Sequence, residues 1–165
     1  MSQFNPTTKT QAALSAAVQS ASAAGNPDVR PGHLLVALLE QQDGIATPLL
    51  QACGVDPQLA LTQAKALTAS YPSASGSGLA APNFNRDALA VISFSQTLAS
   101  EMGDDYVSTE HLLLALSEAV QGLPQHDDIL KAIETVIANG DTTRDMGGSR
   151  STQDVGKAIA ELLGA

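Results

Sequence analysis

Tryptophan is absent from this sequence of 165 residues, and aromatic residues of all kinds make up only 3% of it. Hydrophobic residues still account for 44%, so a core must be built mainly from Ala, Leu, Val and Ile. That set of side chains is typical of closely packed helices. A chain of this length fits one domain, or one domain with a tail, and folding buries roughly two thirds of its unfolded surface.

Basic residues are also scarce. Eight Lys and Arg stand against seventeen Asp and Glu, which gives a net charge of −9. The Lys and Arg residues form no cluster or stripe. Nucleic acid is therefore not an expected partner, because binding to its phosphates needs concentrated positive charge.

Long apolar runs are missing, and there is a single cysteine. Apolar stretches such as Leu34 to Leu39 are far shorter than the ~20 residues of a membrane span. The polar start, Met1 to Thr10, lacks the apolar region of a secretory signal. A lone Cys53 cannot form an intrachain disulfide and is interpreted as a small buried residue rather than a nucleophile. We expect a cytoplasmic protein that does not associate with membranes.

The first 70 residues predict four helices. Apolar residues recur at helical spacing, Gly25 and Gly54 follow two of the expected helices, and Pro31 and Pro57 stand at helix starts. The second helix is apolar on more than one face, which predicts burial. The expected helices span about 10–24, 31–39, 45–52 and 57–68.

Residues 71–82 are rich in Ser, Gly, Ala and Pro and are interpreted as a linker. Beyond it the pattern returns, with helices expected at 85–102 and from Ser108 onward. A shift of 78 positions, the separation of His33 and His111, also places Gly103 on Gly25 and Leu116 on Leu38. The sequence thus predicts an internal repeat, with one copy at about 5–70 and a second at about 83–163.

A duplicated unit predicts the fold class. Each copy carries an apolar face too large to bury alone, so the two are expected to pack against each other. We predict an all-α fold in which two pseudo-repeated four-helix units form one compact domain over residues 1–165.

Three segments carry a resemblance to a known family: 4–11, 30–39 and 103–113. The pattern x-x-H-L-L-x-A-L occurs twice at the separation of the two copies. Over about residues 1–120 the chain resembles the N-terminal Clp repeat domain of the ClpB/Hsp100 disaggregases. Its sequence is most similar to that of actinobacterial ClpB. Related ClpC-like domains usually read T-E-H in both copies, whereas here the first copy reads Pro31-Gly32-His33 and only the second keeps Glu110.

The resemblance implies a non-catalytic module that stands ahead of two AAA+ ATPase rings. Such a module catches exposed apolar segments of unfolded or aggregated proteins and passes them to the rings, which assemble as hexamers. The rings are not in this chain, since no G-x-x-x-x-G-K-[ST] phosphate loop occurs. We expect no catalytic residue and no cofactor, and a monomer for the isolated domain.

The resemblance also implies a substrate-binding groove. Carried over position by position, its residues are Thr7, Phe94, Leu98, Asp104, Glu110 and His111. Each has a structural alternative. Phe94 and Leu98 lie four apart on one helical face and could belong to the core, while Asp104 and Glu110 flank a helix start and could act as local caps.

Carboxylates at the rim of an apolar groove would favour substrates that mix apolar residues with Lys or Arg. His33 and His111 occupy matching places in the two copies, which favours a packing role for both. No metal site is expected, because no Cys or further His stands near either at ligand spacing.

From about residue 123 the chain departs from the family pattern. Residues 129–163 resemble the C-terminal end of isocitrate and isopropylmalate dehydrogenases, but the large α/β framework of those enzymes and a G-x-G-x-x-G motif are absent. We expect no dehydrogenase activity. Helices predicted at about 127–139 and 152–163 would complete the packing of the second copy.

Three functions stay open at this stage. The leading one is the binding module of a disaggregase, which predicts binding to unfolded protein without ATP turnover. A freestanding Clp-repeat adaptor or decoy would instead bind a separately supplied Clp ATPase. A fragment or fusion related to a decarboxylating dehydrogenase would bind a nicotinamide cofactor.

Overall fold

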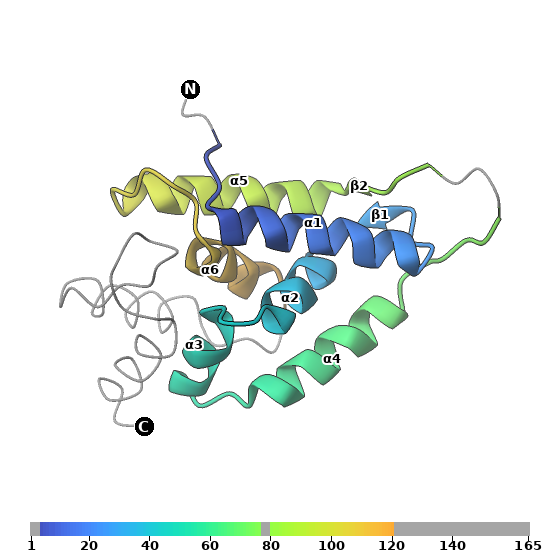
Figure 1. Cartoon of the computed structure of the whole chain (residues 1–165), viewed down its shortest axis with the longest axis horizontal. Coiled ribbons are helices and arrows are strands. Elements are labelled where there is room, and N and C mark those ends of the chain that lie inside the picture. The colour runs from blue at the N-terminus through green and yellow to red at the C-terminus, as the bar shows by residue number, and fades with distance from the viewer. Residues whose placement is uncertain (1–3, 77–79, 121–165) are drawn as a thin grey trace.

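The computed structural model describes residues 4–76 and 80–120, which contain six helices and two very short strands. In chain order the elements are α1 (Thr8–Ala23), β1 (Asp28–Val29), α2 (Pro31–Glu40), α3 (Ala46–Ala52), α4 (Pro57–Ala69), β2 (Asn83–Phe84), α5 (Arg86–Glu101) and α6 (Thr109–Ala119). The predicted all-α class is confirmed (Figure 1).

The ends of the helices follow from local chemistry. The side chains of Thr7, Asp56 and Asn85 accept hydrogen bonds from free backbone N–H groups at the starts of α1, α4 and α5. Gly25 and Gly103 adopt φ angles of 73° and 78° just after α1 and α5, a conformation that favours glycine. All six helices expected in this part of the chain are confirmed, to within about two residues at each boundary that was predicted; no end was predicted for the helix that begins at Ser108.

Part of the second copy lies outside the described residues. The helices expected at 127–139 and 152–163 both fall there, as does the tail from about residue 123. The limits of the two copies and of the linker therefore stay predictions. Among the described helices, none is long and apolar enough to cross a membrane.

The two copies exchange backbone hydrogen bonds in a reciprocal way. β1 pairs in parallel with β2, which places Val29 opposite Phe84, and an isolated parallel bridge joins Pro6 to Val107. The shift of 78 positions converts one pairing into the other. In each case the segment before the first helix of one copy pairs with the segment before the second helix of the other. No pattern in the sequence predicts these pairings.

The flanking hydrogen bonds repeat the symmetry. Thr7 N–H donates to the Val107 carbonyl at 3.0 Å, and Asn85 N–H donates to the Val29 carbonyl at 2.9 Å. Both donors are the residues that cap a first helix. The same residues therefore begin a helix and fasten it to the other copy.

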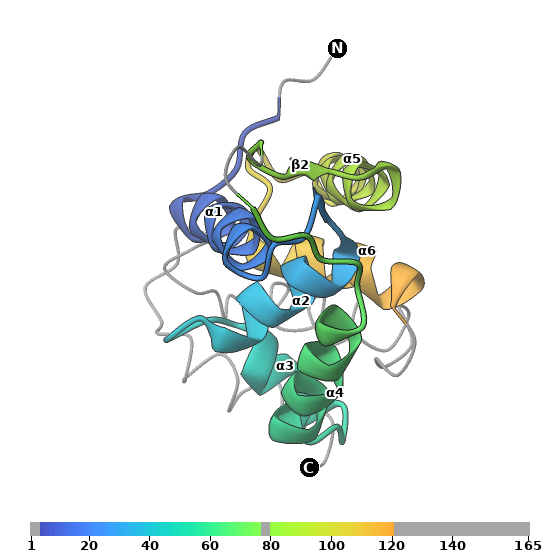
Figure 2. The same cartoon turned by 90° about the vertical axis from the view of Figure 1, so that its right-hand side faces the viewer.

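The core lies where the two copies meet. Helices α2 and α6 are buried over most of their length, as expected for α2 from its apolar faces, and they contact each other. Figure 2 shows α1 and α5 on one side of this pair and α3 and α4 on the other. Ala13, Ala17 and Ala21 form a fully buried stripe on α1, and their small side chains let α1 approach α2 closely.

Candidate functional site

The turn between α5 and α6 holds a buried polar cluster. The His111 side chain is fully buried, and its Nδ1 accepts the Ser108 backbone N–H at 2.9 Å. Because a backbone N–H can only donate, the proton of a neutral imidazole must sit on Nε2. Nε2 lies 2.8 Å from Oδ2 of Asp104 and donates to it. His111 thus ties the start of α6 to the end of the turn that follows α5.

Glu110 is the second residue of α6, and its side chain is also fully buried. The Ser108 hydroxyl donates to Oε1 of Glu110. A carboxylate in the first turn of a helix is stabilised by the free amide groups there. The contacts of Asp104 and Glu110 shown here are with the side chains of His111 and Ser108, so capping of backbone N–H groups by these carboxylates stays a prediction.

The first copy contains the matching histidine with a different partner. His33 Nδ1 accepts the Arg30 backbone N–H at 2.9 Å, and Nε2 lies 2.9 Å from Oδ1 of Asn26. Burial lowers the pKa of His33 below its usual 6.5, the nearby Asp28 carboxylate opposes this, and Arg30 adds to it. Both histidines hold the start of a second helix, as the packing interpretation predicted.

Tyr71 takes the place of a carboxylate in the first copy. Gly32 stands where the second copy has Glu110, and a Cβ atom at Gly32 would lie only 2.4 Å from the Tyr71 hydroxyl. The centroids of the Tyr71 and His33 rings lie 5.1 Å apart, and Cζ of Arg30 lies 4.9 Å from the centroid of the Tyr71 ring. Burial raises the pKa of Tyr71, while a hydrogen bond with the Gly32 backbone opposes the rise. The side chain of Tyr71, which belongs to the linker, therefore covers the start of α2.

Two grooves open beside the start of α2. The α5–α6 groove has a volume of about 480 Å³, and its lining combines apolar side chains with two carboxylates. It is lined by Pro31, Asp87, Ala90, Val91, Phe94, Ala115, Glu118 and Ala119.

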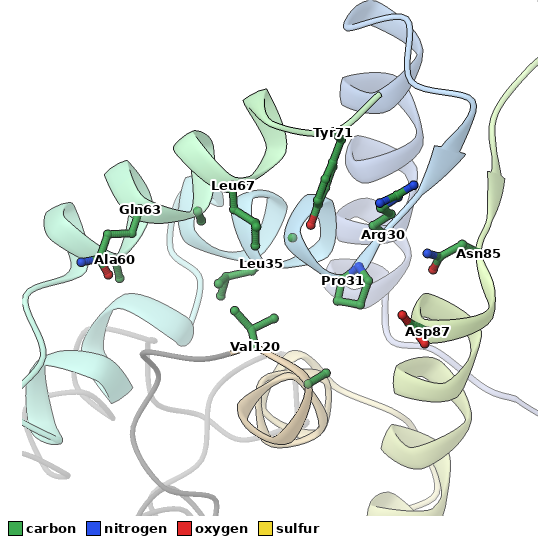
Figure 3. A pocket seen from close by; sticks show the side chains of 13 residues that line it. Arg30, Pro31, Leu35, Ala60, Gln63, Leu67, Tyr71, Asn85, Asp87 and Val120 are labelled. Atoms are coloured by element: carbon green, nitrogen blue, oxygen red, sulfur yellow. The ribbon is translucent and has the colours of Figure 1, made fainter. Parts of the chain in front are cut away.

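The larger α2–α4 groove has a volume of about 640 Å³. Its wall on α4 consists of Ala60, Gln63, Ala64 and Leu67, and Leu35 and Tyr71 also reach it (Figure 3). The two grooves meet, because Pro31, Asp87 and Ala119 line both.

The predicted site residues fall into two groups. Thr7 caps α1 and donates its backbone N–H to Val107. The first group, Thr7, Asp104, Glu110 and His111, therefore lies where the N-terminal segment meets the turn between α5 and α6. Phe94 is half-buried and lines the α5–α6 groove.

Leu98 lies one turn further along α5 and belongs to the core, where its exposed fraction is 5%. Of the predicted residues, Thr7 and Asp104 are partly exposed, whereas Glu110 and His111 are interior.

Sequence reasoning missed most of the groove lining. Asp87, Ala90 and Phe94 follow one another at spacings of three and four on α5, and that helical pattern could have identified one face. Pro31 comes from the first copy and Tyr71 from the linker, and neither carried such a signal. No group of three or more His, Cys, Asp and Glu side chains that could hold a metal occurs in residues 4–76 and 80–120.

Comparison with known proteins places the chain among Clp domains. The family model "Clp repeat (R) N-terminal domain" matches residues 5–133, past the point near residue 123 where the sequence seemed to depart from the pattern. The chaperone protein ClpB of Corynebacterium glutamicum is 62% identical over 117 residues. That match covers 71% of this chain and 14% of ClpB, so the chain spans a small part of its relative.

Solved structures share the fold. The Hsp104 N-terminal domain from Candida albicans aligns with a TM-score of 0.68 at 18% identity, covering 90% of this chain and 97% of that domain. A ClpV N-domain in complex with a VipB peptide aligns with a TM-score of 0.60 at 16% identity, covering 97% of this chain and 88% of that one.

Proposed function

This chain belongs to the Clp repeat (R) N-terminal domain family, and from that premise we propose that it is the substrate-recognition module of a ClpB-like protein disaggregase. The module is non-catalytic. It binds exposed apolar segments of unfolded or aggregated proteins in the cytoplasm and passes them to AAA+ rings that are not in this chain. The observation that carries the proposal is the surface-open α5–α6 groove, whose apolar lining is contributed by both copies.

The groove offers the chemistry that an unfolded segment needs. Ala90, Val91 and Phe94 give it an apolar wall on α5. Misfolded chains expose apolar side chains that gain by leaving water, at roughly 25 cal/mol per Å² of buried area. Asp87 and Glu118 add negative charge at the groove, which favours segments that also carry Lys or Arg.

The residues carried over from the family keep distinct roles in this proposal. Phe94 contacts the substrate directly, and Leu98 supports α5 from the core below it. Asp104, Glu110 and His111 fix the turn that sets where α5 ends, and Thr7 fastens the N-terminal segment beside that turn.

A solved relative lends support from outside the chain. The ClpV N-domain, which shares this fold, has been captured with a VipB peptide. A domain of this fold can therefore present a surface to a peptide. We propose the same general use here, with unfolded clients in place of one dedicated peptide.

The test compares two variants on the same helix. Phe94→Ser removes the large apolar side chain from the groove, whereas Leu89→Ser removes an apolar side chain that is 54% exposed and lines neither groove. We expect Phe94→Ser to weaken binding of a fluorescently labelled, reduced and carboxymethylated model protein by about tenfold, since roughly 1.4 kcal/mol of apolar contact is lost. Leu89→Ser should bind like the unchanged chain.

Equal binding by both variants would remove the groove from the proposal. If the unchanged chain fails to bind unfolded protein but forms a stable complex with a separately supplied Clp ATPase, the adaptor function replaces it. Thermal unfolding of each variant, followed by circular dichroism, checks that folding is retained. The dehydrogenase-like residues 129–163 lie outside the described part of the chain, and no catalysis is proposed for them.

A further inference from the structure

The α2–α4 groove is the larger of the two grooves, and the function proposed above does not use it. It lies on the first copy, between the start of α2 and the face of α4. Its volume of about 640 Å³ and the 480 Å³ of the α5–α6 groove both fall in the range of roughly 300–1,000 Å³ typical of ligand pockets. Because the grooves meet at Pro31, Asp87 and Ala119, a bound chain can pass from one to the other.

Charge at the junction favours one kind of occupant. Arg30, the basic residue that lines the α2–α4 groove, already pairs with Asp28 at 3.0 Å and stacks on Tyr71. No ion pair joins the Asp87 carboxylate to another residue of the described ranges. Figure 3 shows Asp87 beside Pro31 at the edge of the groove. The junction therefore presents, in the first turn of α5, a carboxylate without a paired cation among the described residues, between two grooves that each carry apolar side chains.

We propose that the α2–α4 groove is a second binding subsite, and that the two grooves together hold one extended polypeptide segment with two bulky apolar residues on either side of a Lys or Arg. One apolar side chain enters the α5–α6 groove beside Phe94, and the other packs against Leu67 and Leu35 in the α2–α4 groove. The intervening cation pairs with Asp87. This inference rests on the proposed function, because it assumes that unfolded segments bind at the α5–α6 groove.

A second subsite raises the affinity for a segment whose two apolar residues belong to the same chain. Each apolar contact alone is weak, but a segment held at one groove presents its next apolar residue to the other at high effective concentration. A folded protein rarely exposes two apolar side chains and a cation along one extended stretch. A two-groove site would therefore select unfolded chains over folded ones without reading a particular sequence.

The test uses short labelled peptides with a Gly/Ser background. The double probe carries Phe and Leu on either side of a Lys, in a series with two, four or six residues between the apolar pair. The single probe carries Phe and Lys but no Leu, and the acidic probe replaces Lys in the double probe with Glu. Binding is measured by fluorescence anisotropy at low and high salt.

Two pairs of variants test the two proposed contacts, which are the apolar contact in the α2–α4 groove and the ion pair with Asp87. Leu67→Ser alters the α2–α4 groove, and Leu59→Ser makes the same change on an exposed position of α4 that lines neither groove. Asp87→Asn neutralises the junction, and Asp43→Asn is the same change at an exposed residue away from both grooves.

We expect at least one double probe to bind about tenfold more tightly than the single probe. Leu67→Ser should abolish that advantage and leave the single probe unaffected. Asp87→Asn should weaken the double probe by about twofold to fivefold at low salt and less at high salt, down to the level of the acidic probe. Both control variants should match the unchanged chain.

The possible failures are distinguishable. If neither probe binds the unchanged chain, the proposed function itself is wrong. If single and double probes bind equally at every spacing, or if Leu67→Ser and Leu59→Ser behave alike, the second subsite is overturned while the α5–α6 groove stands.

Discussion

The two copies share a backbone plan but differ in what fills the start of their second helix. In both, a histidine accepts the N–H of the residue before the helix through Nδ1 and donates through Nε2. In the first copy the partner of Nε2 is the amide of Asn26, and in the second it is the carboxylate of Asp104. The hydrogen-bond geometry has been kept, while the charge of the partner has changed.

The neighbouring position differs further. The second copy carries Glu110 on α6 itself, whereas the first copy has Gly32 and receives Tyr71 from the linker. The start of α2 is therefore a wall of the α2–α4 groove built from Tyr71 and the Arg30 guanidinium, whereas the start of α6 is an interior cluster with buried Glu110. Duplication preserved the framework and left the side chains at the helix starts free to specialise.

The largest expected difference between the copies concerns their glycines. Gly25 and Gly103 have similar positive φ angles, so Ala costs about 1–2 kcal/mol of backbone strain at either position. A Cβ atom at Gly25 would also lie 2.4 Å from the Ala74 carbonyl oxygen, whereas one at Gly103 would meet nothing within 4 Å. Gly25→Ala should therefore lower the free energy of unfolding by clearly more than Gly103→Ala, as measured by urea denaturation.

The collision at Gly25 involves backbone, which cannot swing aside like a long side chain. Ala74 N–H also donates to the Gly25 carbonyl at 2.8 Å, so the start of the linker is held against this turn. Equal losses for the two variants would mean that the linker does not stay there in solution.

A smaller and more nearly equal effect is expected at the helix caps. The side chains of Thr7 and Asn85 accept N–H groups three residues ahead, from Thr10 and Ala88. Replacement of either cap by Ala should lower the free energy of unfolding by about 0.5–2 kcal/mol, because an N–H at the helix start loses its acceptor. Urea denaturation of Thr7→Ala and Asn85→Ala checks this, and a loss confined to one variant would contradict the equivalence of the two copies.

The smallest effect, and the sharpest test of the charge difference, is a change in a pKa. Asn26→Asp gives His33 a carboxylate partner like that of His111. An opposite charge at hydrogen-bond distance favours the imidazolium, so the pKa of His33 should rise from its lowered value. Titration of the His33 ring protons by NMR measures it, and Asp104→Asn, which alters the other copy, should leave the His33 value unchanged.

The lowered pKa of His33 in the unchanged chain also predicts how the free energy of unfolding depends on pH. The pKa of His33 in the folded chain lies below the usual 6.5, so as pH falls below 6.5 the unfolded chain takes up this proton first. The contribution of His33 to the free energy of unfolding is therefore present above pH 6.5 and is lost as the pH falls toward its lowered value. Asn26→Asp should reduce this loss between pH 7.5 and 5.5, although the lost amide bond to the Pro72 carbonyl lowers stability at every pH. An unchanged slope would contradict the assignment.

Most of the fold could be predicted from the sequence because its signals are local. Caps such as Thr7 and Asn85, prolines at helix starts and the stop at Gly25 each act within a few residues. The shift of 78 positions then extended the first copy's pattern to the second. The reciprocal pairing of Pro6 with Val107 escaped prediction, because two-residue contacts between distant segments leave no periodic trace.

The site was less predictable for a related reason. Phe94 could be placed near a groove from the family resemblance, but the wall opposite it depends on how the first copy packs. Leu98 is four residues from Phe94 on the same helix, yet one lies in the core and the other at the surface, since α6 covers only part of α5. The role of Tyr71 depends on the path of the linker, which composition alone does not determine.

The crossed backbone pairing has a consequence for the making of the protein. The segment at Pro6 finds its pairing partner only once Val107 has been synthesised, about 100 residues later. At ~5–20 residues per second the ribosome needs roughly 5–20 seconds for that interval. During that time the apolar faces of α1 and α2 that contact α6 stay exposed. The domain therefore passes, during its own synthesis, through a state that resembles the unfolded proteins it is proposed to bind.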